Sequence, residues 1–553
     1  MPQEFHFQKI EESLIKIFKS CLEDLKIPSS IPVLIDIPKE NFLADLYTNL
    51  PLQVSSFVKK SHRECAEDFY SLLLDKIKKN EINEFIKEVK IAGPGFINFS
   101  LRQEFFYKML IEICEKKQDF AKVDIGKGKK VIIEFVSANP TGPLSIAHAR
   151  QAAVGDSLAN ILKLLGFRTF REYYNNDEGN QINILGKSLE LRFKELNGEK
   201  INFPEDFYQG DYLIDLAKEL SEKKLDIKSA DNFREFALEK ISAIIHRELD
   251  DFGVKFDEWY SQRQLRQSGK IQQAIAFLKE KGFVYEQDNA IWFKSTLFGD
   301  DKDRVVIKSD GSYTYLAPDI AYHQDKFKRG FEWLINIWGP DHHGYIPRIK
   351  AAVEALGYDR NSLSVIIVQL ATIFREGKPI SMSTRRGQYI TLREVLNEVG
   401  RDAARFFLLM RRTDSHLEFD LELAKKQTQD NPVFYIQYAY ARICNILKNA
   451  ASLKFDFKKV DLSRLSTEEE IILLRRIFQF NYVLGVCLRQ LDPYALTVYL
   501  QNTAASFHRF YDRHRVIGDD LQLTQARLIL VEALRIVFGK GLDLIGIAKP
   551  EKM

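Results

Sequence analysis

The sequence has few cysteines and no long uncharged apolar run. Its five cysteines lie far apart among 553 residues, without a Cys-x-x-Cys pair or a histidine cluster at metal-ligand spacing. This argues against a disulfide framework and a zinc site, so we expect no structural metal. No stretch approaches the roughly 18–20 uncharged apolar residues of a membrane span. The N-terminus carries acids where a secretory signal has a basic patch. We expect a protein without a membrane anchor in the reducing cytoplasm.

The composition is not extreme in charge or hydrophobicity. Lys and Arg total 80 against 77 for Asp and Glu, and 45% of the residues are hydrophobic. These proportions are typical of folded proteins and exclude a disordered or collagen-like chain. At roughly 100–200 residues per domain, the chain is too long for one core. We therefore expect several folded domains.

Changes of pattern divide the chain into four parts. Residues 1–120 mix helical patterns with short apolar runs and end before a glycine- and lysine-rich connector. Residues 121–400 alternate strand and helix patterns, with a charged helical insertion at about 197–288. A connecting segment at 401–430 leads to residues 431–553, which are helical throughout. The predicted fold class is α/β multidomain: an N-terminal α+β domain, a parallel-sheet domain and a C-terminal all-α helical bundle.

A buried strand at 131–136 is followed by a turn at 137–143 and a helix that starts near Ser145 or Ile146. Further strand patterns at 167–174, 333–338 and 365–370 alternate with helices, which predicts a parallel sheet. Ligands of such sheets bind at the carboxyl ends of the strands, where helix N-termini offer N–H groups to phosphate. His148 falls in the first helical turn. By itself it fits an ordinary N-terminal hydrogen-bonding residue equally well.

A second polar segment spans residues 377–392, where hydroxyl groups alternate with Lys378, Arg385 and Arg386 around glycines. Such a loop could cover a polyphosphate and supply compensating positive charge. A solvated basic turn is the alternative.

Eight segments in order resemble the arginyl-tRNA synthetases, a family of class I aminoacyl-tRNA synthetases. They are VKIAGPGFINF, EFVSANPTGPLSIAHARQAAVGD, YYNNDEGNQI, YTYLAPDIAYHQDKF, IWGPDHHGYIPRIKAAVEALG, MSTRRGQYITLREVLNEVG, DNPVFYIQYAYARI and GIAKPEKM. Each segment alone is a weak signal. Together they cover nearly the full length of the chain.

The resemblance implies a Rossmann-type catalytic domain that condenses L-arginine with ATP, assisted by Mg²⁺, and then esterifies the 3′ end of tRNA(Arg). It implies that residues 1–120 form the additional domain that contacts the tRNA elbow, with Asn49 at the contact. Residues 431–553 would be the anticodon-binding domain, where Tyr435, Tyr438 and Arg442 are the candidate tRNA contacts. The family is commonly monomeric, and its members typically need tRNA before they activate the amino acid.

The resemblance also assigns an arginine pocket. A guanidinium group needs a carboxylate in its plane and a ring against its face, and Tyr315 and Asp319 stand at the family's Y-x-x-x-D spacing. Glu134 and Asn139 match positions at the strand end, where Asn139 would orient the α-amino and carboxylate groups. Gln262 stands where the family tends to have a glutamate that shares the guanidinium. Capping, packing or a strand-edge position is the structural alternative for each.

Two signature motifs are altered. The family's H-x-G-H reads Ser145-Ile146-Ala147-His148, and its K-M-S-K-S-like motif lacks both lysines, so we expect weaker ATP binding or slower activation. Lys378, Arg385 or Arg386 could supply the missing charge. The candidate catalytic residues are His148, Ser145, Ser383, Arg385 and Lys378. The candidate ATP contacts are Ser145, Ala147, His148, Gly339, Asp341, His342 and Met382.

Two other functions remain open at this point. A synthetase paralogue could bind tRNA with little or no adenylation, although such a binder would not need Glu134, Asn139, Tyr315 and Asp319 together. A different nucleotidyltransferase of the superfamily would leave the N-terminal domain and the helical tail unexplained.

Overall fold

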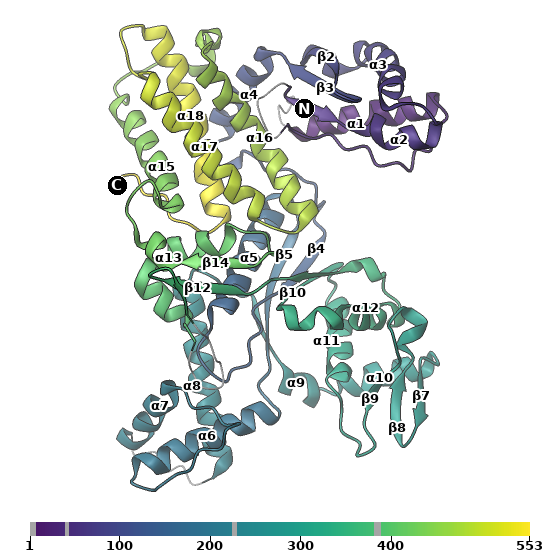
Figure 1. The fold of residues 1–553 in the computed structure, drawn as a ribbon, viewed down its shortest axis with the longest axis vertical. Helices are drawn as coiled ribbons and strands as arrows, with labels where there is room; N and C mark the ends of the chain where they lie inside the picture. The colour runs from purple at the N-terminus through teal and green to yellow at the C-terminus, as the bar shows by residue number, and fades with distance from the viewer. Residues whose placement is uncertain (1–6, 39–43, 224–228, 381–388) are drawn as a thin grey trace.

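The computed structural model describes residues 7–38, 44–223, 229–380 and 389–553 (Figure 1). The N-terminal part pairs an antiparallel sheet, in the order β1-β3-β2, with helices. Its core contains Phe18, whose ring lies 6.0 Å from that of Phe69 and 6.1 Å from that of Phe99. The elements are α1 (Phe7–Asp24), β1 (Leu46–Thr48), α2 (Leu50–Val58), α3 (His62–Lys78), η1 (Glu81–Glu84), β2 (Ile86–Ala92), β3 (Phe96–Leu101), α4 (Gln103–Lys116) and η2 (Lys117–Asp119).

A parallel five-stranded sheet forms the centre of the molecule, in the order β11-β10-β4-β5-β6. Its strands are β4 (Lys130–Glu134), β5 (Arg168–Asn175), β6 (Glu258–Ser261), β10 (Trp333–Trp338) and β11 (Leu363–Ile367). The first of these strands in sequence, β4, therefore lies between the second and the fourth. The order in which the chain adds strands to the sheet therefore reverses between β4 and β10. Doubly wound parallel sheets bind their ligands at this position.

Helices cover the sheet as the sequence pattern predicted. They include α5 (Ile146–Leu164), α11 (Leu316–Lys328) and α12 (Ile346–Ala355). Most side chains of α5 are buried. A Cβ atom on Gly155 would lie only 2.3 Å from Cγ of Phe135, so the glycine lets α5 approach the chain that leaves β4.

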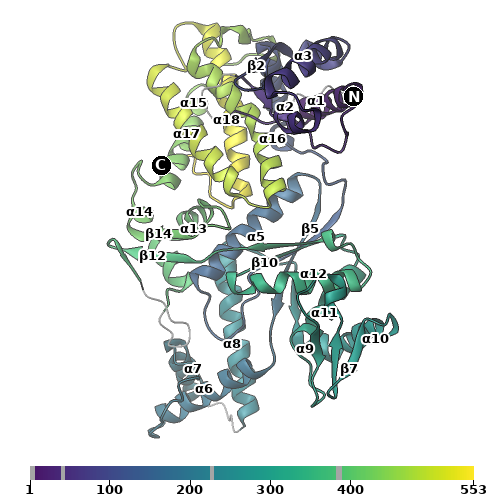
Figure 2. The same cartoon turned by 45° about the vertical axis from the view of Figure 1, so that its right-hand side comes forward.

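Two smaller units extend from the same end of the sheet (Figures 1 and 2). One contains α6 (Asn180–Leu196), α7 (Asp211–Glu222) and α8 (Ala230–Asp251). The other combines α9 (Gln262–Gln267), α10 (Lys270–Glu280) and η3 (Ser295–Phe298) with the antiparallel strands β7 (Val284–Gln287), β8 (Ala290–Phe293) and β9 (Arg304–Ile307). The predicted helical insertion at about 197–288 was wrong for residues 284–287, where β7 pairs antiparallel with β8, and for residues 258–261, where β6 pairs in parallel with β5 at the edge of the sheet. This edge strand has only four residues, too few for a clear periodic signal.

The C-terminal part is helical, which confirms the predicted fold class. It is joined to the sheet through η4 (Pro340–Tyr345), η5 (Arg360–Ser362), β12 (Ala371–Arg375), β13 (Lys378–Pro379), α13 (Leu392–Leu409), β14 (Leu417–Asp420) and α14 (Leu421–Lys425). Gly400, with φ 76°, interrupts α13. The bundle contains α15 (Pro432–Asn449), η6 (Phe457–Lys459), η7 (Leu462–Arg464), α16 (Glu468–Gln490), α17 (Tyr494–Arg513) and α18 (Leu521–Leu544).

In the described ranges, α16 is the one helix whose length and apolar composition would let it cross a membrane. More than half of its apolar stretch is buried inside the protein, as in the core helices of many globular bundles. The N-terminal part lies against this helix, although the two are far apart in sequence (Figures 1 and 2). Gln8 donates a hydrogen bond to the Asn481 carbonyl, and Arg475 lies 2.7 Å from the Asp45 carboxylate.

Candidate functional site

The carboxyl edge of the sheet, between β4 and β10, gathers the polar residues of the site. The chain leaves β4 through a tight turn in which Val136 and Ser137 have φ of 68° and 41°. Such values are rare for residues other than glycine and occur often at functional sites. Because crossover helices run antiparallel to the strands, the N-termini of α5 and α11 face this same edge. The edge therefore combines helix N-terminal N–H groups with the side chains that follow.

His148 lies in the first turn of α5 and is bound to the residue that caps the helix. The Ser145 N–H donates to Nδ1 of His148 at 3.2 Å. Nδ1 is thus an acceptor, and we assign the ring proton to Nε2. Burial lowers the pKa of His148 to about 4. The ring is therefore neutral near pH 7. Because Nδ1 accepts the Ser145 N–H, the Nε2–H group is left to donate to a ligand.

The end of the second signature segment is held against the first. The Tyr389 hydroxyl donates to the Pro143 carbonyl at 2.8 Å, and the Leu392 N–H donates to the Leu144 carbonyl at 2.7 Å. Lys378 is exposed on β13. Four predicted residues of this segment lie outside the described residues: Met382, Ser383, Arg385 and Arg386.

The predicted adenosine contacts follow β10 directly. Gly339 precedes η4, and Asp341 and His342 are exposed within that turn. A Cβ atom on Gly339 would lie 3.7 Å from Nε2 of Gln151, a residue of α5. The segment after β10 therefore lies beside the early turns of α5, where Ser145, Ala147 and His148 are located.

Asp319 is a recessed carboxylate in the first turn of α11. The Tyr345 hydroxyl donates a hydrogen bond to it at 2.5 Å. Burial raises the pKa of Asp319 to about 7; the neighbouring Glu134 carboxylate raises it further, while Tyr345, Lys326 and Arg348 oppose the shift. Asp319 has no ion-pair partner in the described part of the chain. A carboxylate in this state gains most from a cation that enters the recess.

A buried polar network that sequence reasoning missed lies behind Asp319. The Lys326 ammonium lies 2.5 Å from the Glu134 carboxylate and 3.2 Å from the Asn336 side-chain oxygen. His323 bridges this network to the Asp319 backbone carbonyl, at 2.8 Å. Glu134 thus shares its charge with the protein's own lysine, and its contact with arginine stays a prediction. Lys326 follows Asp319 by seven residues, about two helical turns. This spacing could have predicted that both side chains lie on the same face of α11.

The remaining arginine candidates lie on three different segments. Tyr315 precedes α11 and is 78% exposed. Asn139 donates to the Gln181 side chain at 2.6 Å and accepts from Asn176 at 3.1 Å. Gln262 begins α9 and accepts a hydrogen bond from the Tyr174 hydroxyl at 3.1 Å.

The tRNA candidates lie away from this site, in the N-terminal part that contains α2 and in the C-terminal bundle that contains α15 (Figure 1). Asn49 caps α2 and accepts a hydrogen bond from the Gln53 side chain at 2.8 Å. On α15, the Arg442 guanidinium lies 4.6 Å from the ring centre of Tyr438 and 2.7 Å from its hydroxyl. The Tyr435 ring packs 4.5 Å from that of His508. These half-buried rings are partly packed and partly available for stacking.

Comparisons with known proteins match this architecture along the chain. The model of the arginyl tRNA synthetase N terminal domain matches residues 9–101, that of the tRNA synthetases class I (R) catalytic domain matches 110–429, and that of the DALR anticodon binding domain matches 436–553.

Similar proteins and structures carry corresponding names. An arginine–tRNA ligase of Citrifermentans bemidjiense is 44% identical over 99% of this chain and 100% of its own length. One from Listeria monocytogenes is 45% identical over 96% of each chain. The solved arginyl-tRNA synthetase of Thermus thermophilus superposes with a TM-score of 0.78 at 19% identity, covering 98% of this chain and 100% of its own, which supports the fold.

Proposed function

The chain belongs to the arginyl-tRNA synthetases, and from this premise we propose which of its residues serve each step. Its activity is that of an arginine–tRNA ligase: it activates L-arginine with ATP and transfers the amino acid to the 3′ end of tRNA(Arg). AMP and pyrophosphate are the other products. No observation favours a paralogue that only binds tRNA.

The single observation that supports our assignment of the arginine pocket is the state of Asp319. Its carboxyl group is recessed, its pKa is raised to about 7, and no described side chain forms an ion pair with it. A guanidinium stays charged at every relevant pH and offers a planar fork of donors. Asp319 pairs with this group, Tyr315 covers one face of it, and Asn139 orients the α-amino and carboxylate ends. Glu134 contributes through Oε1, which Lys326 does not bind and which accepts a hydrogen bond from the Ser137 hydroxyl at 3.3 Å.

The ATP site lies at the N-terminus of α5. His148 and Ser145 donate hydrogen bonds to phosphate oxygens, together with the free helix N–H groups. Gly339, Asp341 and His342 hold the adenosine, with Ala147 close to the base. Because His148 is neutral, positive charge for the leaving pyrophosphate comes from Lys378 and from Arg385, and Ser383 and Met382 complete that segment.

Magnesium enters this scheme with ATP. In the described ranges, no group of three or more His, Cys, Asp or Glu side chains could hold a metal ion. Mg²⁺ in nucleotide sites is commonly held by phosphate oxygens and one or two carboxylates. We therefore propose that the ion arrives bound to the triphosphate and neutralises charge there.

The tRNA contacts are proposed at the two ends of the chain. Asn49 contacts the tRNA elbow, and Tyr435, Tyr438 and Arg442 contact the anticodon loop, where rings and guanidinium planes stack on unpaired bases. We propose a monomer that works in the cytoplasm; light scattering coupled to gel filtration tests the monomer.

Pyrophosphate exchange with arginine, ATP and Mg²⁺ tests the assignments. Exchange is expected with tRNA(Arg) present, and Asp319→Ala is expected to raise the KM for arginine far more than the KM for ATP. The matched variant Asp341→Ala is expected to do the reverse. Equal effects of either variant on both substrates would contradict the assigned pockets. Tight tRNA binding without exchange under any condition would instead select the paralogue.

A further inference from the structure

Gln262 is a neutral side chain at a position where the guanidinium would be expected to meet a second carboxylate. Its surroundings supply one from elsewhere. Its Oε1 accepts a hydrogen bond from the Tyr174 hydroxyl, and its Nε2 donates to Oε1 of Glu178 at 3.5 Å. Glu178 belongs to the loop between β5 and α6. A carboxylate is thus missing at the start of α9, but Gln262 there contacts the carboxylate of Glu178, which follows the neighbouring strand β5.

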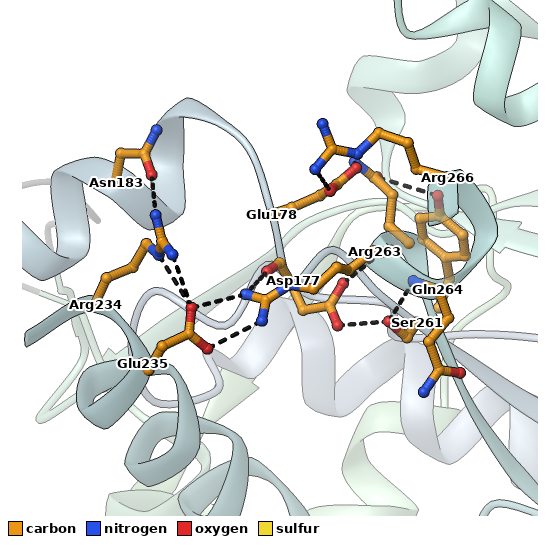
Figure 3. Close-up of polar contacts among 11 residues, drawn as sticks. Asp177, Glu178, Asn183, Arg234, Glu235, Ser261, Arg263, Gln264 and Arg266 are labelled. Carbon is orange, nitrogen blue, oxygen red and sulfur yellow. Dashed lines mark hydrogen bonds and ion pairs between the residues drawn. The ribbon is translucent and has the colours of Figure 1, made fainter. Parts of the chain in front are cut away.

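The loop that carries Glu178 is fixed on both sides (Figure 3). The Ser261 hydroxyl donates to the Asp177 carboxylate at 2.6 Å, and the Arg263 N–H donates to its other oxygen at 2.9 Å. The Arg263 guanidinium is held in turn by Glu235 of α8, at 3.0 Å. Gly179, with φ 96°, then turns the chain into α6. These contacts hold Glu178 near Gln262 before any ligand binds.

The Glu178 carboxylate is held by one long hydrogen bond, from Gln262, and by one ion pair with an exposed side chain, Arg266. Its side chain is 13% exposed, and its Oε2 is shielded from solvent. Nη2 of Arg266 lies 2.7 Å from this oxygen as an ion pair, but the Arg266 side chain is 57% exposed (Figure 3). Exposed ion pairs of this kind contribute little, so a better-placed donor can displace Arg266. Oδ1 of Asn176, in the same loop, is buried without a hydrogen bond from any described residue. An acceptor without a partner beside an ion pair with an exposed side chain favours a ligand that brings N–H donors.

Tyr174 relates Glu178 to the recess of Asp319. Burial raises the pKa of the Tyr174 hydroxyl, and the carboxylates of Asp319, Glu134 and Glu178 add to this shift. The Tyr174 ring also packs 4.6 Å from that of Tyr322, which follows Asp319 by three residues on α11, and its hydroxyl donates to Gln262 at 3.1 Å. Tyr174 thus lies between α11, which carries Asp319, and the loop that carries Glu178.

We propose that Glu178 is a specificity-determining residue that accepts hydrogen bonds from the guanidinium of the substrate L-arginine, opposite Asp319. This inference rests on the proposed arginine pocket and extends it. Glu178 supplies the carboxylate that Gln262 lacks. Arg266 forms an ion pair with Glu178 until the substrate guanidinium displaces it. No covalent step is involved.

Pyrophosphate exchange in the presence of tRNA(Arg) tests the proposal. Glu178→Gln, which keeps the shape and removes the charge, is expected to raise the KM for arginine about ten-fold or more, as for a lost charged hydrogen bond. The KM for ATP is expected to stay within about two-fold. The matched control Arg266→Gln removes the other partner of the ion pair and is expected not to raise the KM for arginine.

A carboxylate exchange completes the design. The double variant Glu178→Gln with Gln262→Glu restores a carboxylate from the other side and is expected to recover most of the arginine affinity. Discrimination against citrulline, a neutral analogue of arginine, is expected to fall in Glu178→Gln and to return in the double variant. A merely structural role would not change this ratio, and thermal unfolding of each variant checks folding.

Three results would overturn the proposal: an unchanged KM for arginine in Glu178→Gln, an equal rise in Arg266→Gln, or no recovery in the double variant. Failure of the proposed function gives a different result, because the wild-type protein would then fail to exchange or charge arginine at all.

Discussion

Lowering the pH through 7 is expected to weaken arginine binding while ATP binding stays unchanged. The pKa of Asp319 in the free enzyme is raised to about 7, so the carboxyl group is mostly protonated at pH 6. A guanidinium must displace that proton to pair with the carboxylate. One unit below the pKa, about one site in ten is ionised, so the KM for arginine rises about ten-fold, or about 1.4 kcal/mol. Above pH 8 the KM reaches a plateau.

The assay is pyrophosphate exchange with tRNA(Arg) at pH values from about 5.5 to 8.5, with KM measured for both substrates. His148 adds no inflection in this range, because its pKa is lowered to about 4 and it stays neutral. Calorimetry in two buffers of different ionisation enthalpy is expected to detect release of nearly one proton when arginine binds at pH 6. A KM for arginine that stays flat from pH 6 to 8, with no proton released, would refute the reasoning.

The same shift has the opposite consequence for stability. An acid whose native pKa lies above its ordinary value of 3.8 binds more protons in the native state than in the unfolded state between these values. The native protein therefore loses stability as the pH rises from about 3.8 to about 7. Asp319→Asn is expected to unfold at a higher temperature than the wild type at pH 8 without arginine, while it loses the pH dependence of the KM. A lower unfolding temperature would show that Asp319 is a stabilising ion-pair member.

Three further changes test neighbouring contacts. Lys326→Met leaves the Glu134 carboxylate buried and unpaired, and is expected to lower the free energy of unfolding by about 3–5 kcal/mol in thermal or denaturant unfolding. Tyr345→Phe removes the hydrogen bond that favours the charged form of Asp319, so the inflection in the KM for arginine is expected to move above pH 7. Arg442→Ala is expected to weaken tRNA binding and to reduce the slope of log affinity against log salt by about 1, whereas an unchanged slope would place Arg442 away from phosphate.

The sequence predicted the central sheet well, because buried parallel strands are continuous apolar runs that need no partner to be recognised. The strand predicted at 333–338 forms as β10, and the helix after the first turn begins at Ile146 as expected. The strand β6 was missed because four residues with mixed burial carry no periodicity, and only pairing with β5 makes them a strand.

The candidate site was predictable where its residues share a motif. Tyr315 and Asp319 are four residues apart at the start of one helix, so spacing alone relates them. Lys326 and Glu134 are 192 residues apart, and their ion pair depends on how α11 packs against β4. Tyr345 reaches Asp319 only because β10 places η4 beside α11. No pattern in the chain marks Glu178 as a neighbour of Gln262, since this contact requires the β5–β6 pairing that was itself missed.

The proposed arrangement would account for selectivity without a separate editing site. An arginine guanidinium is planar and offers five N–H donors, so it can meet Asp319 and Glu178 with different edges. Citrulline has the same shape but no charge, and would leave Asp319 protonated or unpaired in its recess. Lysine carries the charge as a compact ammonium, which can pair with one carboxylate but cannot span two in a plane. A site built around buried polar groups rejects ligands that leave those groups unpaired more strongly than an apolar pocket rejects a missing methylene. In the proposed pocket, arginine would therefore be favoured both by its charge and by its geometry, and each carboxylate would contribute to a different part of that choice.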